Sequence, residues 1–231
     1  MNNIKGIIFD YGGTLDTNGV HWFHIFRQVY AEHLPQVNEE QLREAYIYGE
    51  RYLATHHVIE SSDDFLSMLI KKIAIQTLQL GIEDEDAINK LAEDCDALVR
   101  TNMQTTSEVL DRLSGRYPLV LVSNFYGNIH AVLRSYGIEN YFNDIIESAI
   151  VGIRKPDPQI FALGVKALGL QSDETLVIGD SYSKDIAPAH SLGCRTLWLK
   201  GQGWDTKEDC TDTPCADAVI SALSQALELL Q

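Results

Sequence analysis

Basic residues are scarce in this sequence. Its 231 residues include 18 lysines and arginines against 33 aspartates and glutamates, which gives a formal net charge of −15. A surface this negative repels the phosphate backbone of nucleic acids and anionic lipid headgroups. The composition therefore argues against a nucleic-acid or membrane partner. An anionic ligand would need a local cationic pocket that opposes the overall charge.

Cysteines and long apolar runs are also rare. The four cysteines, Cys95, Cys194, Cys210 and Cys215, form no CxxC pair, and no histidine has zinc-finger spacing. Cys210 and Cys215 share a polar loop where they could pair or bind a metal, but unpaired thiols are favoured. No run approaches the roughly 18 apolar residues of a membrane span, and the first residues lack the apolar stretch of a signal peptide. We therefore expect a soluble, reduced, cytoplasmic protein, and a monomer, because no separate oligomerisation segment is present.

Short apolar, β-branched runs recur along the chain and predict buried strands. They are residues 4–9, 119–122, 175–178 and 195–198, with 144–148 as a weaker candidate. Helical patterns separate these runs, including a stripe at 129–136 that Gly137 ends and a stripe at 161–168 that follows Pro158. Strands that alternate with helices pair in parallel through crossover helices. The sequence thus predicts an α/β fold, a doubly wound parallel sheet covered on both faces.

Residues 17–106 differ from the rest because they contain no strand-like run. Amphipathic helical stripes occur there instead, namely Leu42, Ala45, Tyr46 and Gly49, and then Ile88, Leu91, Cys95 and Leu98. We therefore expect a small all-helical domain at 17–106, inserted between the first and second strands. Residues 1–16 and 107–231 would form the α/β core.

Polar residues follow several of the predicted strands. The first strand leads into Asp10-Tyr11-Gly12-Gly13-Thr14, the second into Ser123-Asn124, and the strand at 175–178 into Gly179-Asp180-Ser181, with Asp185 soon after; Arg154-Lys155-Pro156-Asp157-Pro158 lies between the last two. Ligands of an open parallel sheet bind beyond the carboxyl ends of its strands. Two carboxylates beside one lysine suit a Mg²⁺ ion that holds a phosphate.

The segments FDYGGTLD, LVSNF, RKPDP and GDSYSKD, in this order, resemble the motifs of the haloacid-dehalogenase-like (HAD) hydrolase superfamily. The resemblance covers the whole chain and implies a Rossmann-like core with a helical cap domain inserted after the first motif. It further implies that Asp10 is a nucleophile that forms an aspartyl-phosphate intermediate. Thr14 and Ser123 would bind the phosphoryl oxygens, Asn124 would support them, and Lys155 would neutralise their charge.

The same resemblance implies a Mg²⁺ site. Asp10, Asp180 and the backbone carbonyl of Gly12 would coordinate the ion, and Asp185 would fix the geometry of these ligands. Simpler roles remain open for some residues, since Asp185 could instead cap the helix that follows it. Ser123 and Asn124 could likewise cap the next helix. The implied function is a Mg²⁺-dependent phosphatase for a small phosphorylated metabolite.

Gly12 departs from the pattern of the phosphatases that this sequence resembles. They carry a second aspartate two residues after the nucleophile, which protonates the leaving oxygen and then activates water. General acid–base catalysis contributes about 10²–10⁴-fold, so its absence matters. Asp16 or His21 could supply the proton, or the substrate could have a good leaving group. The rival interpretation is a protein that binds a phosphorylated ligand with little or no turnover.

Other chemistries of the superfamily fit the sequence less well. Dehalogenases lack the metal carboxylates, whereas Asp180 and Asp185 are present here. Phosphonoacetaldehyde hydrolases need an early cap lysine for a Schiff base, and no lysine lies between Lys5 and Lys71. Periodicity leaves undecided whether some polar residues of the helical insertion face the pocket or the solvent, namely Arg27, Tyr48, Arg51 and His56.

Overall fold

One parallel sheet of six strands forms the centre of the molecule, in the order β3-β2-β1-β4-β5-β6. The computed structural model describes residues 3–204 and 215–230. The strands are β1 (Gly6–Phe9), β2 (Leu119–Ser123), β3 (Asp144–Glu147), β4 (Thr175–Gly179), β5 (Arg195–Leu199) and β6 (Ala218–Ile220). The α-helices are α1 (Trp22–His33), α2 (Glu39–Thr55), α3 (Phe65–Gln79), α4 (Glu85–Ser114), α5 (Ile129–Ser135), α6 (Ser148–Val151), α7 (Gln159–Leu168), α8 (Ala187–Ser191) and α9 (Ala226–Leu229). Shorter helical turns are η1 (Glu139–Tyr141), η2 (Ser172–Glu174), η3 (Tyr182–Ile186) and η4 (Leu223–Gln225).

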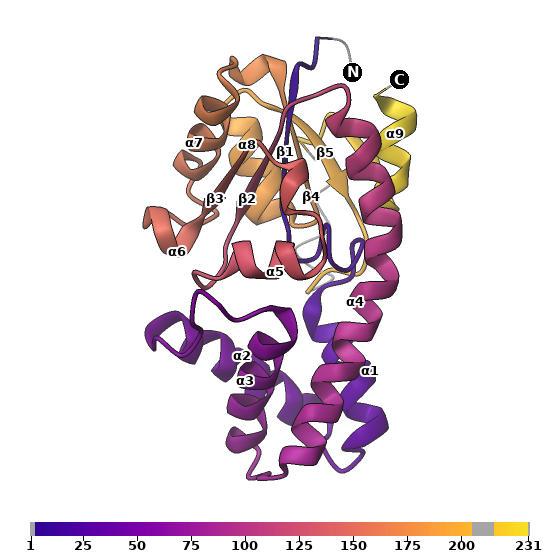
Figure 1. The fold of residues 1–231 in the computed structure, drawn as a ribbon, viewed down its shortest axis with the longest axis vertical. Helices are drawn as coiled ribbons and strands as arrows, with labels where there is room; N and C mark the ends of the chain where they lie inside the picture. Colours follow the sequence, from indigo (N-terminus) through magenta and orange to yellow (C-terminus); the bar gives the residue numbers. More distant parts are fainter. Residues whose placement is uncertain (1–2, 205–214, 231) are drawn as a thin grey trace.

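The predicted α/β fold is confirmed, because each strand pairs in parallel with its neighbours and helices cover both faces of the sheet (Figure 1). Ile7 and Phe9 of β1 belong to a core that includes side chains of α4, α5 and α9. Ile8, between them, packs on the other face with Phe161 and Val165 of α7. This alternation is what a strand buried on both faces requires. The sequence prediction missed β6, whose three residues are too few to form a recognisable run.

Residues 22–106, here called the helical lobe, lie below the sheet in the view of Figure 1. They contain α1, α2, α3 and the first part of α4. The predicted stripe on α2 is buried, but the predicted stripe on α4 is right only in part. Leu98 is 37% exposed and Val99 is buried instead, because Leu98 lies at the edge of that helical face.

Helix α4 runs without a break from the helical lobe to the side of the sheet (Figure 1). The predicted boundary at residues 106/107 therefore lies inside α4, and the division into domains stays a prediction. Near this point Asn102 Nδ2 donates hydrogen bonds to the carbonyls of Leu15 (3.0 Å) and Asp16 (2.9 Å), and Thr106 Oγ1 donates to Leu15 (2.8 Å). These bonds fix the loop after β1 to α4.

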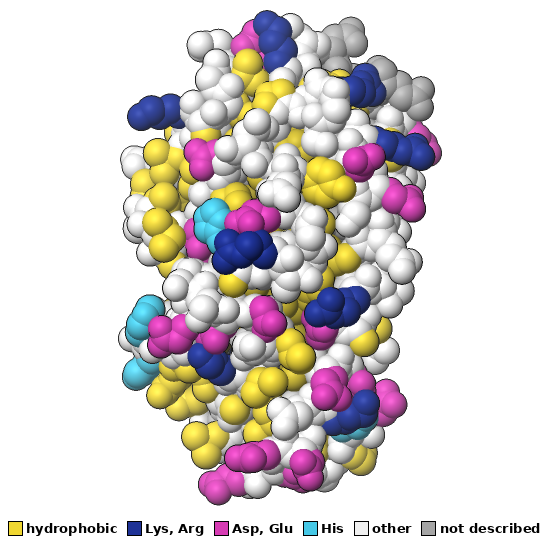
Figure 2. Space-filling model, viewed as in Figure 1, with side chains coloured by type: hydrophobic (Ala, Val, Ile, Leu, Met, Phe, Trp, Pro, Cys, Tyr) yellow, Lys and Arg dark blue, Asp and Glu magenta, His cyan; other side chains and the backbone are white. Residues whose placement is uncertain are grey.

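Acidic side chains gather at the lower end of the molecule in Figure 2, where α4 begins.

Within the described ranges, no helix has both the length and the apolar character needed to cross a bilayer. Cys95, Cys194 and Cys215 are free thiols, whereas Cys210 lies outside the described residues.

A close backbone contact between Gly19 and Gly201 ties the loop after β5 to the loop after β1. Gln202 pairs with Val20 and accepts a hydrogen bond from the His21 amide (2.8 Å). A Cβ at Gly201 would lie 2.1 Å from the carbonyl oxygen of Gly19, so a larger residue must move the backbone. The contact thus sets the position of His21 relative to the loop after β5.

We therefore expect Gly201→Ala to destabilise the protein by about 1–3 kcal/mol, the usual cost of overpacking. Thermal unfolding followed by circular dichroism should show a Tm lower by at least about 2 °C. Gly115→Ala is the matched control, because its Cβ would meet nothing closer than 3.8 Å at a backbone φ of −68°. Equal Tm values for the two variants would contradict the packing argument.

Candidate active site

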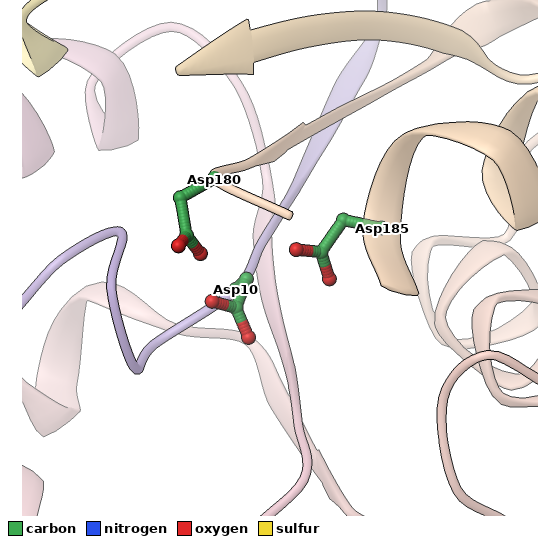
Figure 3. A group of neighbouring side chains, drawn as sticks. All are labelled: Asp10, Asp180 and Asp185. Carbon is green, nitrogen blue, oxygen red and sulfur yellow. The ribbon is translucent and has the colours of Figure 1, made fainter. Parts of the chain in front are cut away.

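Three carboxylates converge at the carboxyl ends of β1 and β4. The two strands are neighbours, with Phe9 opposite Ile178, so the next residues bring Asp10 close to Asp180. Asp185 reaches the same point from η3. One oxygen from each carboxylate lies within 4.8 Å of the other two, and the three groups point toward a common space (Figure 3).

This crowding is electrostatically unfavourable without a cation. Burial and then the charges of Asp10 and Asp185 raise the pKa of Asp180 well above its usual range. Burial also raises the pKa of Asp185 to about 6, although the charge of Lys155 opposes that shift. A divalent cation would remove the repulsion, and a donor set made only of oxygen suits Mg²⁺. The residues present therefore fit the expected metal.

Thr14 connects two of these carboxylates. Its hydroxyl lies 3.0 Å from Asp10 Oδ2 and 3.2 Å from Asp180 Oδ1, and it accepts a hydrogen bond from the Asp180 amide (3.0 Å). The preceding residue must be glycine, because a Cβ at Gly13 would lie 2.3 Å from Asp180 Oδ2 and its φ is +94°. The Gly-Thr pair of the first motif thus lets the loop pass close to Asp180.

Lys155 supplies the positive charge of the site. Its buried ammonium is ion-paired with Asp10 Oδ1 and with Asp185 Oδ1, the latter at 2.7 Å. Burial alone would lower the pKa of Lys155, but the two carboxylates outweigh that effect and raise it. The lysine therefore stays protonated. Asp185 is ion-paired with this ammonium and accepts a hydrogen bond from the Ser181 amide (3.1 Å). The residue before α8 is Ile186, so Asp185 does not cap that helix.

Asn124 holds the backbone of Lys155 rather than capping a helix. Its amide group donates to the Lys155 carbonyl (3.1 Å) and accepts from the Lys155 amide (2.9 Å). Asn128 occupies the position before α5, so neither Ser123 nor Asn124 caps that helix. Ser123 ends β2, is buried, and lines the same cavity as Asp10 and Lys155. The structure thus brings together all the site residues expected from the sequence.

Gly12 leaves open space beside Asp16. A Cβ at position 12 would have only Asp16 Oδ2 nearby, at 4.0 Å, and Gly12 is not among the glycines with positive φ. Asp16 is buried and accepts hydrogen bonds from the Gly13 amide (2.6 Å), Thr17 Oγ1 (3.2 Å) and Trp22 Nε1 (2.7 Å). Burial raises the pKa of Asp16 to about 7, because its hydrogen bonds offset only part of the desolvation.

His21, the other candidate proton donor, has a different environment. Its Nδ1 accepts a hydrogen bond from the Phe23 amide (3.2 Å) at the start of α1, and its ring packs against Tyr46 and Trp204. Burial, and then the charge of Lys184, lowers the pKa of His21 to about 3. The imidazole is therefore neutral at physiological pH and is a poor proton donor.

A cavity of about 580 Å³ lies above the carboxylates, between the sheet edge and the helical lobe. A volume of this size suits a small organic ligand. Of the four polar residues whose orientation the periodicity left undecided, Arg51 lines the cavity. The sequence prediction missed Glu50, Lys72 and Tyr126, which also line it. Lys72 had a recognisable signal, because it occupies the buried apolar face of α3.

The sequence argued against Schiff-base chemistry because no lysine lies between Lys5 and Lys71. Lys72 lies just past that segment and lines the cavity, so its environment must be considered. Its ammonium is ion-paired with Glu50 and lies 3.3 Å from the Tyr126 hydroxyl. Burial alone would lower the pKa of Lys72, but the charge of Glu50 outweighs the effect of burial, and the pKa is raised. A lysine held protonated in this way lacks the free amine that an imine requires.

Comparison with known proteins gives the same assignment as the motifs. Residues 4–193 match the family model "haloacid dehalogenase-like hydrolase". The glyceraldehyde 3-phosphate phosphatase of Methanocaldococcus jannaschii is 35% identical over 96 residues, which are 41% of this chain and 40% of that protein. The phosphoserine phosphatase of Thermus thermophilus is 32% identical over 92 residues, which are 39% and 37% of the two chains. These matches thus span about two fifths of the relatives' length.

The solved structures agree on the fold. A crystal structure of a dehalogenase with an intermediate complex superposes with a TM-score of 0.66 at 17% identity, over 99% of this chain and 98% of that one. Identity this low supports the shared architecture and nothing finer. The family match over residues 4–193 shows that the chain belongs to the haloacid dehalogenase-like hydrolase family.

Proposed function

We propose that this protein is a Mg²⁺-dependent phosphatase that hydrolyses a small phosphorylated metabolite through an aspartyl-phosphate intermediate on Asp10. The observation that carries the proposal is the position of the Asp10 carboxylate beneath the cavity, between Thr14 and Lys155. The cavity of about 580 Å³ suits a metabolite rather than a macromolecule. The two phosphatase names among the relatives support the same class of substrate.

The side chains around Asp10 suit phosphoryl transfer. Lys155 and Ser123 line the cavity beside Asp10 and would bind the phosphoryl oxygens of an ester there, and Asn124 holds Lys155 in place. Thr14 is fully buried and does not line the cavity, so the role that its hydrogen bonds support is to orient Asp10 and Asp180. An Asp10 oxygen attacks phosphorus and the bond from phosphorus to the alcohol oxygen breaks. Water then attacks the aspartyl phosphate, which releases inorganic phosphate and restores the carboxylate. Preorganised charge of this kind is the main catalytic contribution in such reactions.

The carboxylate cluster supports Mg²⁺ as the metal. Asp10, Asp180 and the Gly12 carbonyl would hold the ion, with Asp185 fixing the arrangement beside Lys155. Bound there, Mg²⁺ would neutralise charge on the phosphoryl oxygens.

Mg²⁺ should therefore stabilise the protein. At a concentration 100-fold above its dissociation constant, a ligand adds about 2.7 kcal/mol, or about 5–10 °C in Tm. Asp180→Asn should abolish this rise. In EDTA at pH 7, the Asp180→Asn variant should also have a higher Tm than wild type. The raised pKa of Asp180 means that its negative charge destabilises the metal-free fold, and asparagine removes that charge.

The control for this measurement is Asp111→Asn, a change of an exposed residue on α4 that should leave the Mg²⁺ effect intact. Equal Tm values in Mg²⁺ and EDTA, together with undiminished phosphatase activity in EDTA, would exclude the metal site.

Asp10→Asn should eliminate turnover, because the amide is nearly isosteric with the carboxylate but is a poor nucleophile. Phosphate release from p-nitrophenyl phosphate measures the effect, and circular dichroism checks that the variant folds. Turnover within tenfold of wild type would remove Asp10 from the role of nucleophile.

Asp16 is our candidate for the acid that Gly12 cannot provide. Its carboxyl lines the cavity beside the position where a side chain at residue 12 would begin. With a pKa of about 7, a substantial fraction is protonated near neutral pH. His21 is less suited, because its low pKa leaves it without a proton to give.

If Asp16 protonates the leaving alcohol, Asp16→Asn should lower kcat on alkyl phosphates by about 10²-fold or more. The loss on p-nitrophenyl phosphate should be smaller, because nitrophenolate leaves without a proton. Gly12→Asp in the Asp16→Asn background should restore turnover of alkyl phosphates, since the backbone and the open space accept the side chain. Equal losses on both esters with no rescue would instead mean that Asp16 only holds the loop through Gly13 and Trp22.

The second candidate function is a phospho-ligand binder that turns over slowly or not at all, and the observation that favours it is Gly12. Tight phosphate binding without hydrolysis of p-nitrophenyl phosphate would support this candidate. Dehalogenation and phosphonate cleavage fit less well, because Asp180 and Asp185 complete a carboxylate cluster and Lys72 is held protonated by Glu50.

A further inference from the structure

The cavity differs from the rest of the molecule in its balance of charge. The whole chain has nearly twice as many acidic as basic residues, 33 against 18. The residues that line the cavity include five of each kind: Asp10, Asp16, Glu50, Asp180 and Asp185, and Arg51, Lys72, Arg154, Lys155 and Lys184. A bound divalent cation would make this surface net positive. Cations are thus concentrated here against the overall charge of the protein.

Two of the five cations are already neutralised. Lys155 is ion-paired with Asp10 and Asp185, and Lys72 is ion-paired with Glu50. Both lysines are buried. They belong to the interior of the site and leave little positive charge for a second group on the substrate.

The other three cations, Arg51, Arg154 and Lys184, are exposed side chains that line the cavity. Among the residues that the structure describes, none of the three has a carboxylate partner, although eight other lysines and arginines with solvent-accessible side chains do: Lys5, Arg27, Arg43, Lys71, Lys90, Arg100, Arg134 and Arg195. Because all three of these cations line one cavity, an anion bound there would be able to pair with them.

The three cations surround the phosphate site from different elements. Arg154 directly precedes Lys155 and Lys184 directly precedes Asp185, so both lie about 4 Å along the backbone from site residues. Arg51 comes from α2 in the helical lobe, on the other wall. Lys184 and Arg154 line the same cavity as His21 and Tyr126.

We propose that the substrate is a phosphomonoester with a second anionic group, a carboxylate or a second phosphate, which Arg51, Arg154 and Lys184 bind at the opening of the cavity. This inference rests on the proposed phosphatase function. The planar guanidinium of arginine donates paired hydrogen bonds to carboxylates and phosphates. The same charges attract an anionic substrate to a protein whose overall charge repels it.

The experiment compares three phosphate esters of one carbon skeleton in the presence of Mg²⁺. Glycerol 3-phosphate has an uncharged tail, 3-phosphoglycerate has a carboxylate, and glycerol 1,3-bisphosphate has a second phosphate. We expect kcat/KM for one of the charged-tail esters to exceed that for glycerol 3-phosphate by about tenfold or more, the effect of one or two charged hydrogen bonds. The ester with the larger ratio identifies the anionic group.

Variants then locate the binding groups. The measured quantity is the ratio of kcat/KM for the preferred charged-tail ester to kcat/KM for glycerol 3-phosphate. We expect each single variant to lower this ratio by about threefold or more, namely Arg51→Gln, Arg154→Gln and Lys184→Gln. The triple variant should bring the ratio near one. Ionic strength near 0.5 M should also lower the ratio, because these cations are exposed to screening. Lys166→Gln is the control: it removes the same charge from an exposed position on α7 and should leave the ratio unchanged.

Ratios at or below one for both charged-tail esters would overturn the inference, as would an equal fall of the ratio in Lys166→Gln. If no ester is hydrolysed, including p-nitrophenyl phosphate, the proposed phosphatase function fails. Calorimetric binding of the same three esters then decides the inference: tighter binding of a charged-tail ester, lost in the triple variant, supports it, and equal binding of all three rejects it.

Discussion

Repulsion among three carboxylates, two of them buried and one half-buried, is the constraint on which the rest of the site depends. Parallel pairing of β1 with β4 brings Asp10 and Asp180 to the same edge, and η3 adds Asp185. Such a cluster is stable only with compensating positive charge. Lys155 provides part of it through two ion pairs. The remaining imbalance, which appears as raised carboxyl pKa values, is what makes this edge of the sheet suited to a divalent cation and a phosphate.

The surrounding structure holds these charges in place by backbone contacts that few residue types allow. Glycine at position 13 lets the first loop approach Asp180, and the side chain of Asn124 fixes the backbone of Lys155. Helix α4 continues from the helical lobe to the sheet and is hydrogen-bonded to the first loop through Asn102 and Thr106. The wall of the cavity formed by the helical lobe and the charges beneath it are therefore parts of one framework.

Gly12 shows how the local environment changes the meaning of a missing side chain. Taken alone, the glycine removes an acid and argues for an inactive relative. In the structure, the carboxyl of Asp16 lies beside that open position and has a pKa near neutrality because it is buried. Its hydrogen bonds to Gly13 and Trp22 also give it a structural role. The two roles are compatible, since a loop that is held rigid also keeps its carboxyl at a fixed place.

The sequence by itself determined the fold class and the polar residues of the sheet edge. Apolar strand runs that alternate with helices require a parallel sheet, and residues that follow adjacent strands must meet at its carboxyl edge. Asp10 and Asp180 could be named for that reason, because each directly follows a strand. Lys155 lies in the loop between α6 and α7, and its role was implied by the family resemblance. Only the tertiary structure decided which side chains of the helical lobe face the cavity. Leu98 is exposed although helical periodicity favours its burial, and periodicity left undecided whether Arg51, which lines the cavity, faces the pocket or the solvent. A helix's periodicity defines its apolar face but not its rotation and position against a partner, and those depend on contacts between residues far apart in the sequence.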